Sequence, residues 1–193
     1  MNLLFTGASG FLGTHLMPLL QKVFQVKTMG LMEEDNYKVN LATTIPEIQE
    51  EFDVVLHAAG KAHMVPKTES EKKAFFDINF QGTVNLCKAL GNSGVPKAFI
   101  FVSTVAVYGL EFGENITEEH PLNGDTPYAL SKIQAEEYLT DWCARNNVTL
   151  GIIRPSLIAG PNPPGNLGDM ISGIKTGKYL SIAGGKARKS LLM

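Results

Sequence analysis

The stretch TGASGFLG, residues 6–13, holds three glycines at three-residue spacing, between a short apolar run and an amphipathic pattern. This arrangement is typical of a buried strand, a tight turn and a helix. Gly7 would let the chain turn sharply, Gly10 would let the backbone approach a pyrophosphate, and Gly13 would let the helix pack closely on the sheet. Free N–H groups at the start of a helix favour phosphate, so the stretch predicts a dinucleotide-binding turn.

Strand-like and helix-like patterns alternate along the rest of the chain. The expected strands are residues 2–7, 24–30, 37–41, 53–60, 97–109 and 148–155, and the expected helices are residues 11–23, 46–51, 69–91 and 127–146. Pro18 costs the first helix a hydrogen bond and predicts a kink or an early end. The alternation predicts an α/β fold, a doubly wound parallel sheet with helices on both faces. Ligands of such sheets bind beyond the carboxyl ends of the strands.

The character of the sequence changes after Pro155. Residues 159–170 are rich in turn-forming residues, and residues 169–180 predict a helix leading to an edge strand. We therefore expect a dinucleotide-binding domain over residues 1–158 and the start of a smaller substrate-binding region over 159–193. An apolar strand begins at the last residues, which indicates a truncated chain. The alternative is a natural terminus with a disordered end.

Composition narrows the class of protein. The 193 residues are 44% hydrophobic, and 17 basic against 19 acidic residues give a net charge of −2, which does not favour a nucleic-acid partner. No apolar run has the length of a membrane span or follows a basic leader, so neither a membrane protein nor a secreted one is expected. Cys87 and Cys143 are far apart and show no metal-ligand spacing, which favours a reducing cytoplasm and no metal site.

Tyr128 and Lys132 lie four residues apart in the expected helix 127–146, so their side chains share one face. A neighbouring ammonium and a positively charged nicotinamide ring would favour the phenolate and lower the tyrosine pKa. Ser103 and Thr104, at the end of an expected strand, supply a hydroxyl that could orient a substrate C–OH group. By itself, the pair could be a solvated helix surface. The glycine turn and the hydroxyls favour a site of proton transfer.

Six segments resemble a known family: TGASGFLG, HAAG, NFQGTVNL, VSTVAVYG, PYALSK and RPSLIAGP, which run in order across residues 3–161. In these segments the chain resembles extended short-chain dehydrogenases/reductases of the NAD-dependent epimerase/dehydratase family, which act largely on nucleotide sugars. The resemblance implies a Rossmann-type fold, a nicotinamide cofactor and a nucleotide-sugar substrate.

The resemblance also implies roles for single residues. Tyr128 would be the acid/base and Lys132 its partner, with Thr104 as the catalytic hydroxyl and Ser103 in support. Asn79 would brace the active-site strands. The candidate cofactor-binding residues are Gly7, Ser9, Gly10, Phe11, Leu12, Gly13, Asn40, Leu41, His57, Ala58, Ala59, Asn79, Lys132 and Pro155. The candidate substrate contacts are Lys61, His63 and Asn166.

Departures from the family pattern narrow the reaction. The 4,6-dehydratases of the family follow the catalytic threonine with Asp-Glu, whereas this chain has Val105 and Ala106, so no acid is available there to eliminate water. Many sugar epimerases carry an asparagine where this chain has Leu157. The end of the second strand carries Met29 with no arginine nearby, which favours NAD and leaves NADP open.

The sequence therefore predicts an NAD(P)-dependent oxidoreductase or epimerase acting on a hydroxyl or keto carbon of a nucleotide sugar, at C4 by the resemblance. One alternative is a reductase of a non-sugar carbonyl. Another is a non-catalytic, cofactor-binding regulatory protein, against which the retention of Tyr128, Lys132 and Thr104 argues. A homodimer that pairs the helices 69–91 and 127–146 is a further option implied by the resemblance.

Overall fold

The computed structural model describes residues 1–62, 64–179 and 190–193. The chain divides into two compact units, residues 1–154 and residues 155–193. The second unit holds a helix, α5 (Gly165–Lys175), and two short strands, β7 (Leu157–Ile158) and β8 (Leu191–Leu192), which pair in parallel. None of the helices described is both long and apolar enough to span a membrane.

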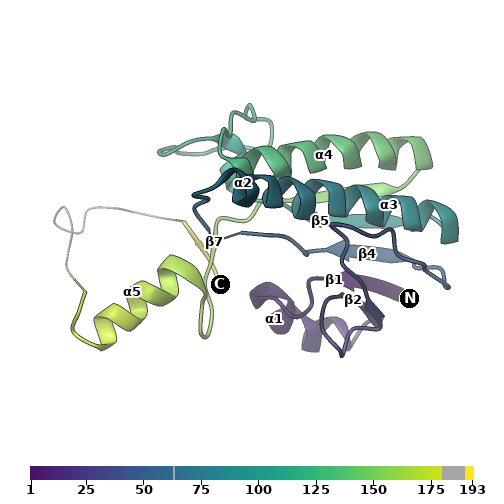
Figure 1. Cartoon of the computed structure of the whole chain (residues 1–193), viewed down its shortest axis with the longest axis horizontal. Coiled ribbons are helices and arrows are strands. Elements are labelled where there is room, and N and C mark those ends of the chain that lie inside the picture. The colour runs from purple at the N-terminus through teal and green to yellow at the C-terminus, as the bar shows by residue number, and fades with distance from the viewer. Residues whose placement is uncertain (63, 180–189) are drawn as a thin grey trace. The chain divides into compact units, whose positions relative to one another are not determined.

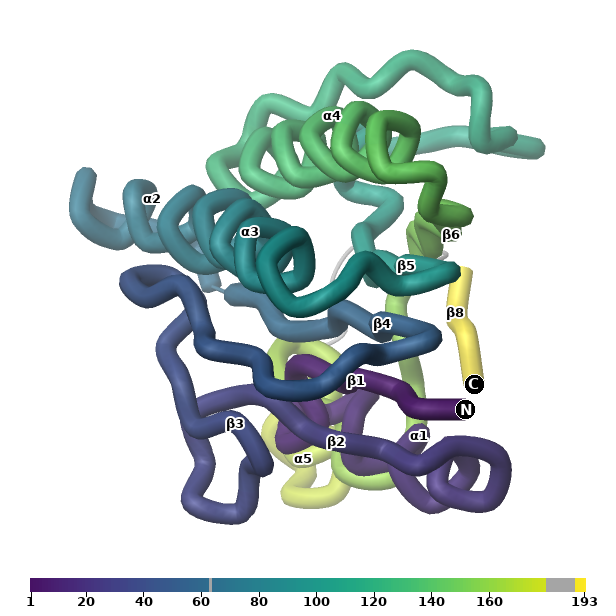
Figure 2. The backbone as a smooth tube through the Cα atoms, turned by 90° about the vertical axis from the view of Figure 1, so that its right-hand side faces the viewer, coloured from purple at the N-terminus to yellow at the C-terminus, as the bar shows by residue number. Residues whose placement is uncertain are grey.

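A six-stranded parallel sheet is the centre of the first unit. Its strands are β1 (Asn2–Thr6), β2 (Gln25–Gly30), β3 (Tyr37–Lys38), β4 (Val54–His57), β5 (Ala98–Val102) and β6 (Thr149–Ile153). Their spatial order is β3-β2-β1-β4-β5-β6, which can be followed in Figure 2. The order reverses beside β1, since β2 and β3 lie on one side of it and β4 to β6 on the other. The doubly wound prediction is confirmed, and ligands of such sheets bind at this reversal.

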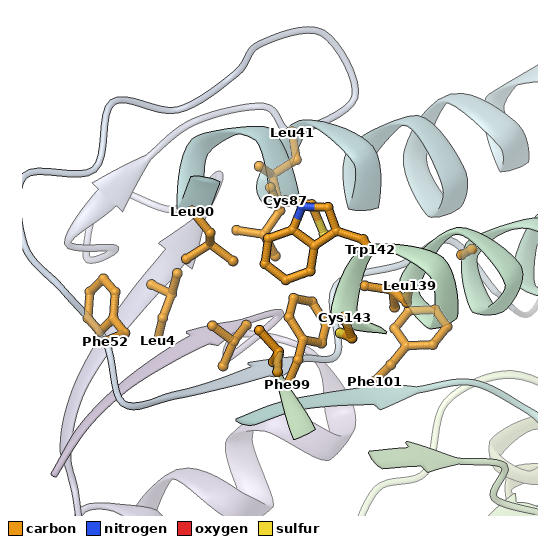
Figure 3. Packing of buried hydrophobic residues seen from close by; sticks show 14 of the residues in the cluster. Leu4, Leu41, Phe52, Cys87, Leu90, Phe99, Phe101, Leu139, Trp142 and Cys143 are labelled. Atoms are coloured by element: carbon orange, nitrogen blue, oxygen red, sulfur yellow. The ribbon is translucent and has the colours of Figure 1, made fainter. Parts of the chain in front are cut away.

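Helices cover both faces of the sheet (Figure 1). One face is covered by α1 (Phe11–Leu20), and the other by α2 (Glu69–Phe75), the π-helical turn η1 (Phe76–Gln81), α3 (Gly82–Ser93) and α4 (Pro127–Asn146). Side chains of a strand alternate between faces, so Phe99 and Phe101 of β5 pack under α3 and α4 while Ile100 packs with the α1 side. Figure 3 shows Trp142 of α4 among these buried rings.

The helix predicted at residues 46–51 is wrong, because the segment forms neither a helix nor a strand. Its burial alternates with a period of two. Pro46, Ile48 and Phe52 are buried or half-buried, whereas Glu47 and Gln49 are exposed. Ile48 and Phe52 belong to the main core. A six-residue helix gains too few hydrogen bonds to pay its nucleation cost, so burial of alternate side chains decides the conformation.

Other expected elements differ at their ends. The helix expected at 69–91 runs on to Ser93, where Gly94 with φ 137° ends it. The strand expected at 97–109 stops at Val102 and is followed by a 3₁₀ turn, η2 (Val105–Tyr108), in which the Thr104 side chain caps the Ala106 N–H group. The helix expected at 169–180 is α5, which begins earlier because Pro164 supplies an extended residue before it. The edge strand expected after it lies outside the described residues.

Candidate active site

The glycine turn after β1 has the geometry of a phosphate cradle. Gly7 has φ +79°, and a Cβ there would lie 2.6 Å from the Ala59 backbone nitrogen, so the turn after β1 packs directly on the chain that leaves β4. A Cβ on Gly13 would overlap with the carbonyl oxygens of Gly7 and Ala8. Gly10 has only one such neighbour, the Gly7 oxygen at 3.3 Å. Packing therefore requires glycine at positions 7 and 13. Gly10 leaves open the backbone surface that a pyrophosphate would approach.

The start of α1 offers unoccupied hydrogen-bond donors to an anion. Its N-cap, Gly10, has no side chain to cap it, and the first turn carries no acidic residue. The first N–H groups of a helix lack partners inside the helix, and the helix dipole adds partial positive charge there. The residues present thus fit a dinucleotide pyrophosphate.

Tyr128 and Lys132 are held on consecutive turns of α4. The helix starts at Pro127, and the Thr126 hydroxyl accepts a hydrogen bond from the Ala129 N–H group at 3.1 Å. Burial raises the pKa of Tyr128, and a hydrogen bond with Thr104 lowers it by less. The lowered tyrosine pKa expected from the neighbouring ammonium is therefore not found, because burial is the larger effect and the hydrogen bond with Thr104 is the only opposing one. Thr104 lies at the Tyr128 hydroxyl, and Lys132 follows Tyr128 by one turn of α4.

Lys132 is anchored at the end of β5. Its Nζ donates to the Val102 carbonyl oxygen at 2.9 Å and lies 4.5 Å from the centroid of the Phe101 ring. The side chain is buried, with the whole residue 3% exposed. Burial lowers the pKa of Lys132 to about 8, and the nearby Glu136 carboxylate opposes this shift. The ammonium and the neutral amine are thus close in free energy near neutral pH.

Two hydroxyls lie where β5 ends. Thr104 Oγ1 accepts a hydrogen bond from the Ala106 N–H group at 3.2 Å, so its own hydrogen can be donated to the Tyr128 oxygen or to a substrate. Ser103 Oγ is buried and has no hydrogen-bond partner among the described residues. Buried polar atoms without partners are rare in native proteins. Ser103 therefore fits the supporting role that the resemblance implies for it.

Asn79 connects the loop after β4 to the turn of α4 that carries Tyr128. Its Oδ1 accepts from the Lys61 N–H group at 2.7 Å, and its Nδ2 donates to the Lys61 oxygen at 3.1 Å and to Ser131 Oγ at 2.9 Å. Ser131 in turn donates to the Tyr128 carbonyl oxygen at 2.8 Å. Asn79 lies in η1, and π turns inside helices are frequent at functional sites.

His57 is a buried, fully paired side chain. Thr6 and Phe101 are its register partners on β1 and β5, and its ring stacks on Phe101 with centroids 5.6 Å apart. Nδ1 pairs with the Thr6 hydroxyl at 2.6 Å and Nε2 with the Thr83 hydroxyl at 3.0 Å. Thr83 donates its hydrogen to the Asn79 backbone carbonyl oxygen, so it accepts from Nε2–H. Burial lowers the pKa of His57, so the ring is neutral and Nδ1 accepts from the Thr6 hydroxyl. The ring has no free nitrogen for a cofactor.

The pKa of His57 predicts a pH-dependent stability. Burial lowers its pKa from 6.5 to about 3 in the folded chain. The unfolded chain binds a proton that the folded chain does not, so the stabilisation is complete above pH 6.5 and is lost as the pH falls toward 3. The slope is about 1.4 kcal/mol per pH unit. Urea unfolding between pH 7 and 4.5 should show this slope in the wild-type chain.

Two variants separate His57 from the acidic residues that also titrate in this range. His57→Gln should flatten the slope, because glutamine can satisfy the same two threonines without taking up a proton. His15→Gln, at an exposed histidine, should leave it unchanged. Equal slopes in the wild-type and His57→Gln chains would contradict the buried neutral assignment.

The remaining predicted residues are placed as follows. Asn40 Oδ1 accepts from the Ala42 N–H group at 3.0 Å, and Leu41 is buried in the main core. Lys61 Nζ lies 5.7 Å from the centroid of the Phe75 ring, which neighbours Tyr128. Ser9, Phe11, Leu12, Ala58 and Ala59 belong to the turn and strand ends around Gly7. His63 lies outside the described residues, and Pro155 and Asn166 belong to the second unit.

Sequence reasoning missed the ion pair that follows Lys132 on α4. Glu136, four residues after Lys132, pairs with Arg154 at the end of the first unit. The repeat of the four-residue spacing from Tyr128 through Lys132 to Glu136 was a signal that could have indicated it. No group of three or more His, Cys, Asp or Glu residues that could hold a metal occurs in residues 1–62, 64–179 and 190–193.

Comparisons with known proteins identify the family of the chain. The model of the NAD dependent epimerase/dehydratase family matches residues 3–192. An Escherichia coli O157:H7 protein, N-acetyl-alpha-D-glucosaminyl-diphospho-ditrans,octacis-undecaprenol 4-epimerase, is 36% identical over 98% of this chain and 59% of its own length. The UDP-glucose 4-epimerase of Vibrio cholerae is 30% identical over 91% of this chain and 57% of its own. The chain thus spans less than two thirds of these relatives.

Solved structures show the same fold. A UDP-galactose 4-epimerase structure superposes with a TM-score of 0.80 and 21% identity, and covers 100% of this chain and 67% of that one. The UDP-glucuronic acid 4-epimerase from Bacillus cereus, solved with UDP-glucuronic acid and NAD, superposes with a TM-score of 0.76 and 21% identity, over 92% of this chain and 64% of that one.

Proposed function

The chain belongs to the NAD-dependent epimerase/dehydratase family, and from this premise we propose that it binds NAD and supports oxidation and reduction at C4 of a diphosphate-linked sugar. The observation that carries the proposal is the convergence of Tyr128, Lys132 and Thr104 near the carboxyl end of β5, two strands from the glycine turn. The sugar carbon is taken from the relatives, two of which are named 4-epimerases. Activity on a sugar is proposed for the whole protein.

Each residue has a definite task in this proposal. Gly7, Gly10 and Gly13 hold the pyrophosphate at the start of α1. Thr104 donates its hydrogen to the substrate oxygen and orients it toward Tyr128, whose phenolate form takes the hydroxyl proton and becomes the neutral phenol. Lys132 stabilises that phenolate with its ammonium before the proton is taken. Bound NAD supplies the acceptor for hydride from the same carbon.

The end of β2 supports NAD over NADP. The Asp35 carboxylate folds back onto Gly30, where a Cβ would lie 2.5 Å from Asp35 Oδ2, and it accepts from the Met32 N–H group at 2.9 Å. An acidic side chain at this position suits the ribose hydroxyls of NAD and repels a 2′-phosphate. In the sequence, Asp35 lies several residues beyond the end of the second strand, where an acidic residue is expected. The turn after β2 returns the Asp35 side chain to that end.

The absence of an acid after Thr104 restricts the reaction. Val105 and Ala106 lie in η2 and offer no proton donor. Elimination of water from the sugar, as in a 4,6-dehydratase, needs such a donor. Inversion or simple reduction at C4 is therefore the outcome that we propose.

Two measurements test the proposed function. NAD and NADP are titrated against the chain by calorimetry, and NAD is expected to bind more tightly. Sugars linked to UDP, GDP or polyprenyl diphosphate are then incubated with the protein and NAD, and the products are analysed for inversion at C4, because an epimerase causes no net change in NADH absorbance. Failure to bind either nucleotide would overturn the proposal. A 4,6-dehydrated product would overturn the restriction.

A further inference from the structure

We propose that Glu136, held in a buried ion pair by Arg154, is a positioning residue that keeps Lys132 protonated beside Tyr128. Glu136 follows Lys132 by four residues on α4, so both side chains lie on the same helix face. The positioning role rests on the proposed function, because that function assigns the proton-transfer step to Tyr128. The effect of the Glu136 carboxylate on the protonation of Lys132 does not depend on the proposed function.

The ion pair between Glu136 and Arg154 is two-pronged and largely shielded from solvent. Arg154 Nε lies 3.2 Å from both carboxylate oxygens of Glu136, and Nη2 lies 2.7 Å from Oε2. The side chains are 16% and 4% exposed for Arg154 and Glu136, respectively. Such a two-pronged contact fixes the direction of the carboxylate, and partners of this kind are required where charges are buried.

Arg154 also joins the turn that follows Thr104. Its Nη1 donates to the Tyr108 hydroxyl at 3.0 Å and to the Glu118 carbonyl oxygen at 2.9 Å, and the guanidinium lies 5.2 Å from the centroid of the Tyr108 ring. Hydrogen bonding to Glu136 is the main effect that raises the pKa of Arg154 above its ordinary value. One guanidinium therefore connects β6, α4, η2 and the loop after η2.

The surroundings of Lys132 leave Glu136 as its nearest source of negative charge. Tyr128 is one turn before it on α4, and His57 of β4, a neutral group, stacks on the same Phe101 ring that the Lys132 ammonium contacts. The Val102 oxygen, the Gly60 backbone and the Asn79 amide lie nearby and carry no net charge. Arg154 stands behind the Glu136 carboxylate and weakens its field at Lys132.

This arrangement has opposite consequences for the two members of the pair. Removing the carboxylate should make the Lys132 ammonium less stable, because burial then acts without opposition. Removing the guanidinium should make the ammonium more stable, because the carboxylate loses its nearest counter-charge. A pair that served only to hold the fold together would not give shifts of opposite sign.

The test is a pH titration of Lys132 in the chain without cofactor. The protein is labelled with ¹³Cε-lysine, and the Lys132 resonance is assigned by its loss in Lys132→Met. Glu136→Gln is expected to move the titration midpoint down from about 8 by about half a pH unit or more. Arg154→Met is expected to move it up.

Two further variants serve as controls. Glu137→Gln removes an exposed carboxylate from the same helix and should leave the midpoint in place. Arg154→Lys keeps the positive charge and should also leave the midpoint in place. If Arg154→Met does not fold, Arg154→Gln replaces it, because it removes the positive charge and keeps hydrogen-bond donors. An unmoved midpoint in Glu136→Gln, or shifts of the same sign in Glu136→Gln and Arg154→Met, would overturn the inference. Neither result depends on NAD binding or turnover, so this failure is distinguishable from failure of the proposed function.

Discussion

Tyr128→Phe is expected to lower turnover by about 10²- to 10⁴-fold, the range that a positioned acid/base contributes. The substitution removes only the phenolic oxygen, and the ring can keep its place 6.0 Å from the Phe75 ring, so α4 should not shift. The backbone contacts of Tyr128, including the hydrogen bond from Ser131, do not involve the hydroxyl. NAD affinity should therefore stay close to that of the wild type. Turnover is measured by product analysis and NAD binding by calorimetry.

A matched control lies on the same helix. Tyr138 is half-buried and packs edge-on against Phe80, away from Thr104 and Lys132. Tyr138→Phe should leave both turnover and NAD affinity unchanged. Wild-type turnover in Tyr128→Phe would remove the acid/base role from Tyr128. A joint loss of turnover and NAD binding would instead show that the hydroxyl supports the cofactor site.

Gly13→Ala and Gly10→Ala are expected to fail in different ways. A Cβ on Gly13 would overlap with two backbone carbonyls, and backbone cannot move aside as a flexible side chain can, so the variant should lose much of its stability. A Cβ on Gly10 meets only the Gly7 oxygen at 3.3 Å, and its φ of −74° suits any residue. Gly10→Ala should therefore remain folded while its methyl group blocks the approach of the pyrophosphate.

Thermal unfolding and NAD titration separate the two effects. Gly10→Ala should unfold within a few degrees of the wild type and bind NAD at least tenfold more weakly, which corresponds to about 1.4 kcal/mol of binding free energy. Gly13→Ala should show a much lower unfolding temperature. A Gly10→Ala chain that binds NAD with wild-type affinity would place the pyrophosphate elsewhere than at the start of α1.

Much of the fold could be predicted because its signals are local. The glycine spacing of residues 6–13 gave the strand, turn and helix, and Pro127 with the apolar spacing gave both bounds of α4. The segment 46–51 was mispredicted because its composition suits a helix, while its alternate burial against the core appears only when the sheet is assembled. The π turn at Phe76–Gln81 was missed for the same reason. Asn79 there has partners in distant segments, and no spacing within the helix reveals them.

Sequence alone determined the order of the elements and predicted the phosphate-binding turn, because these depend on neighbours within a few residues. It also predicted roles for Tyr128, Lys132 and Thr104, from their spacing, their order along the chain and the family resemblance. Tertiary structure decided the charge states around them. His57 is neutral because its ring is enclosed and paired by Thr6 and Thr83, which are 51 and 26 residues away. The Glu136 carboxylate is held in one direction because Arg154, which directly follows β6, pairs with it. Burial and pairing of this kind depend on which distant segments come together, and they set the free energy of protonation of each side chain.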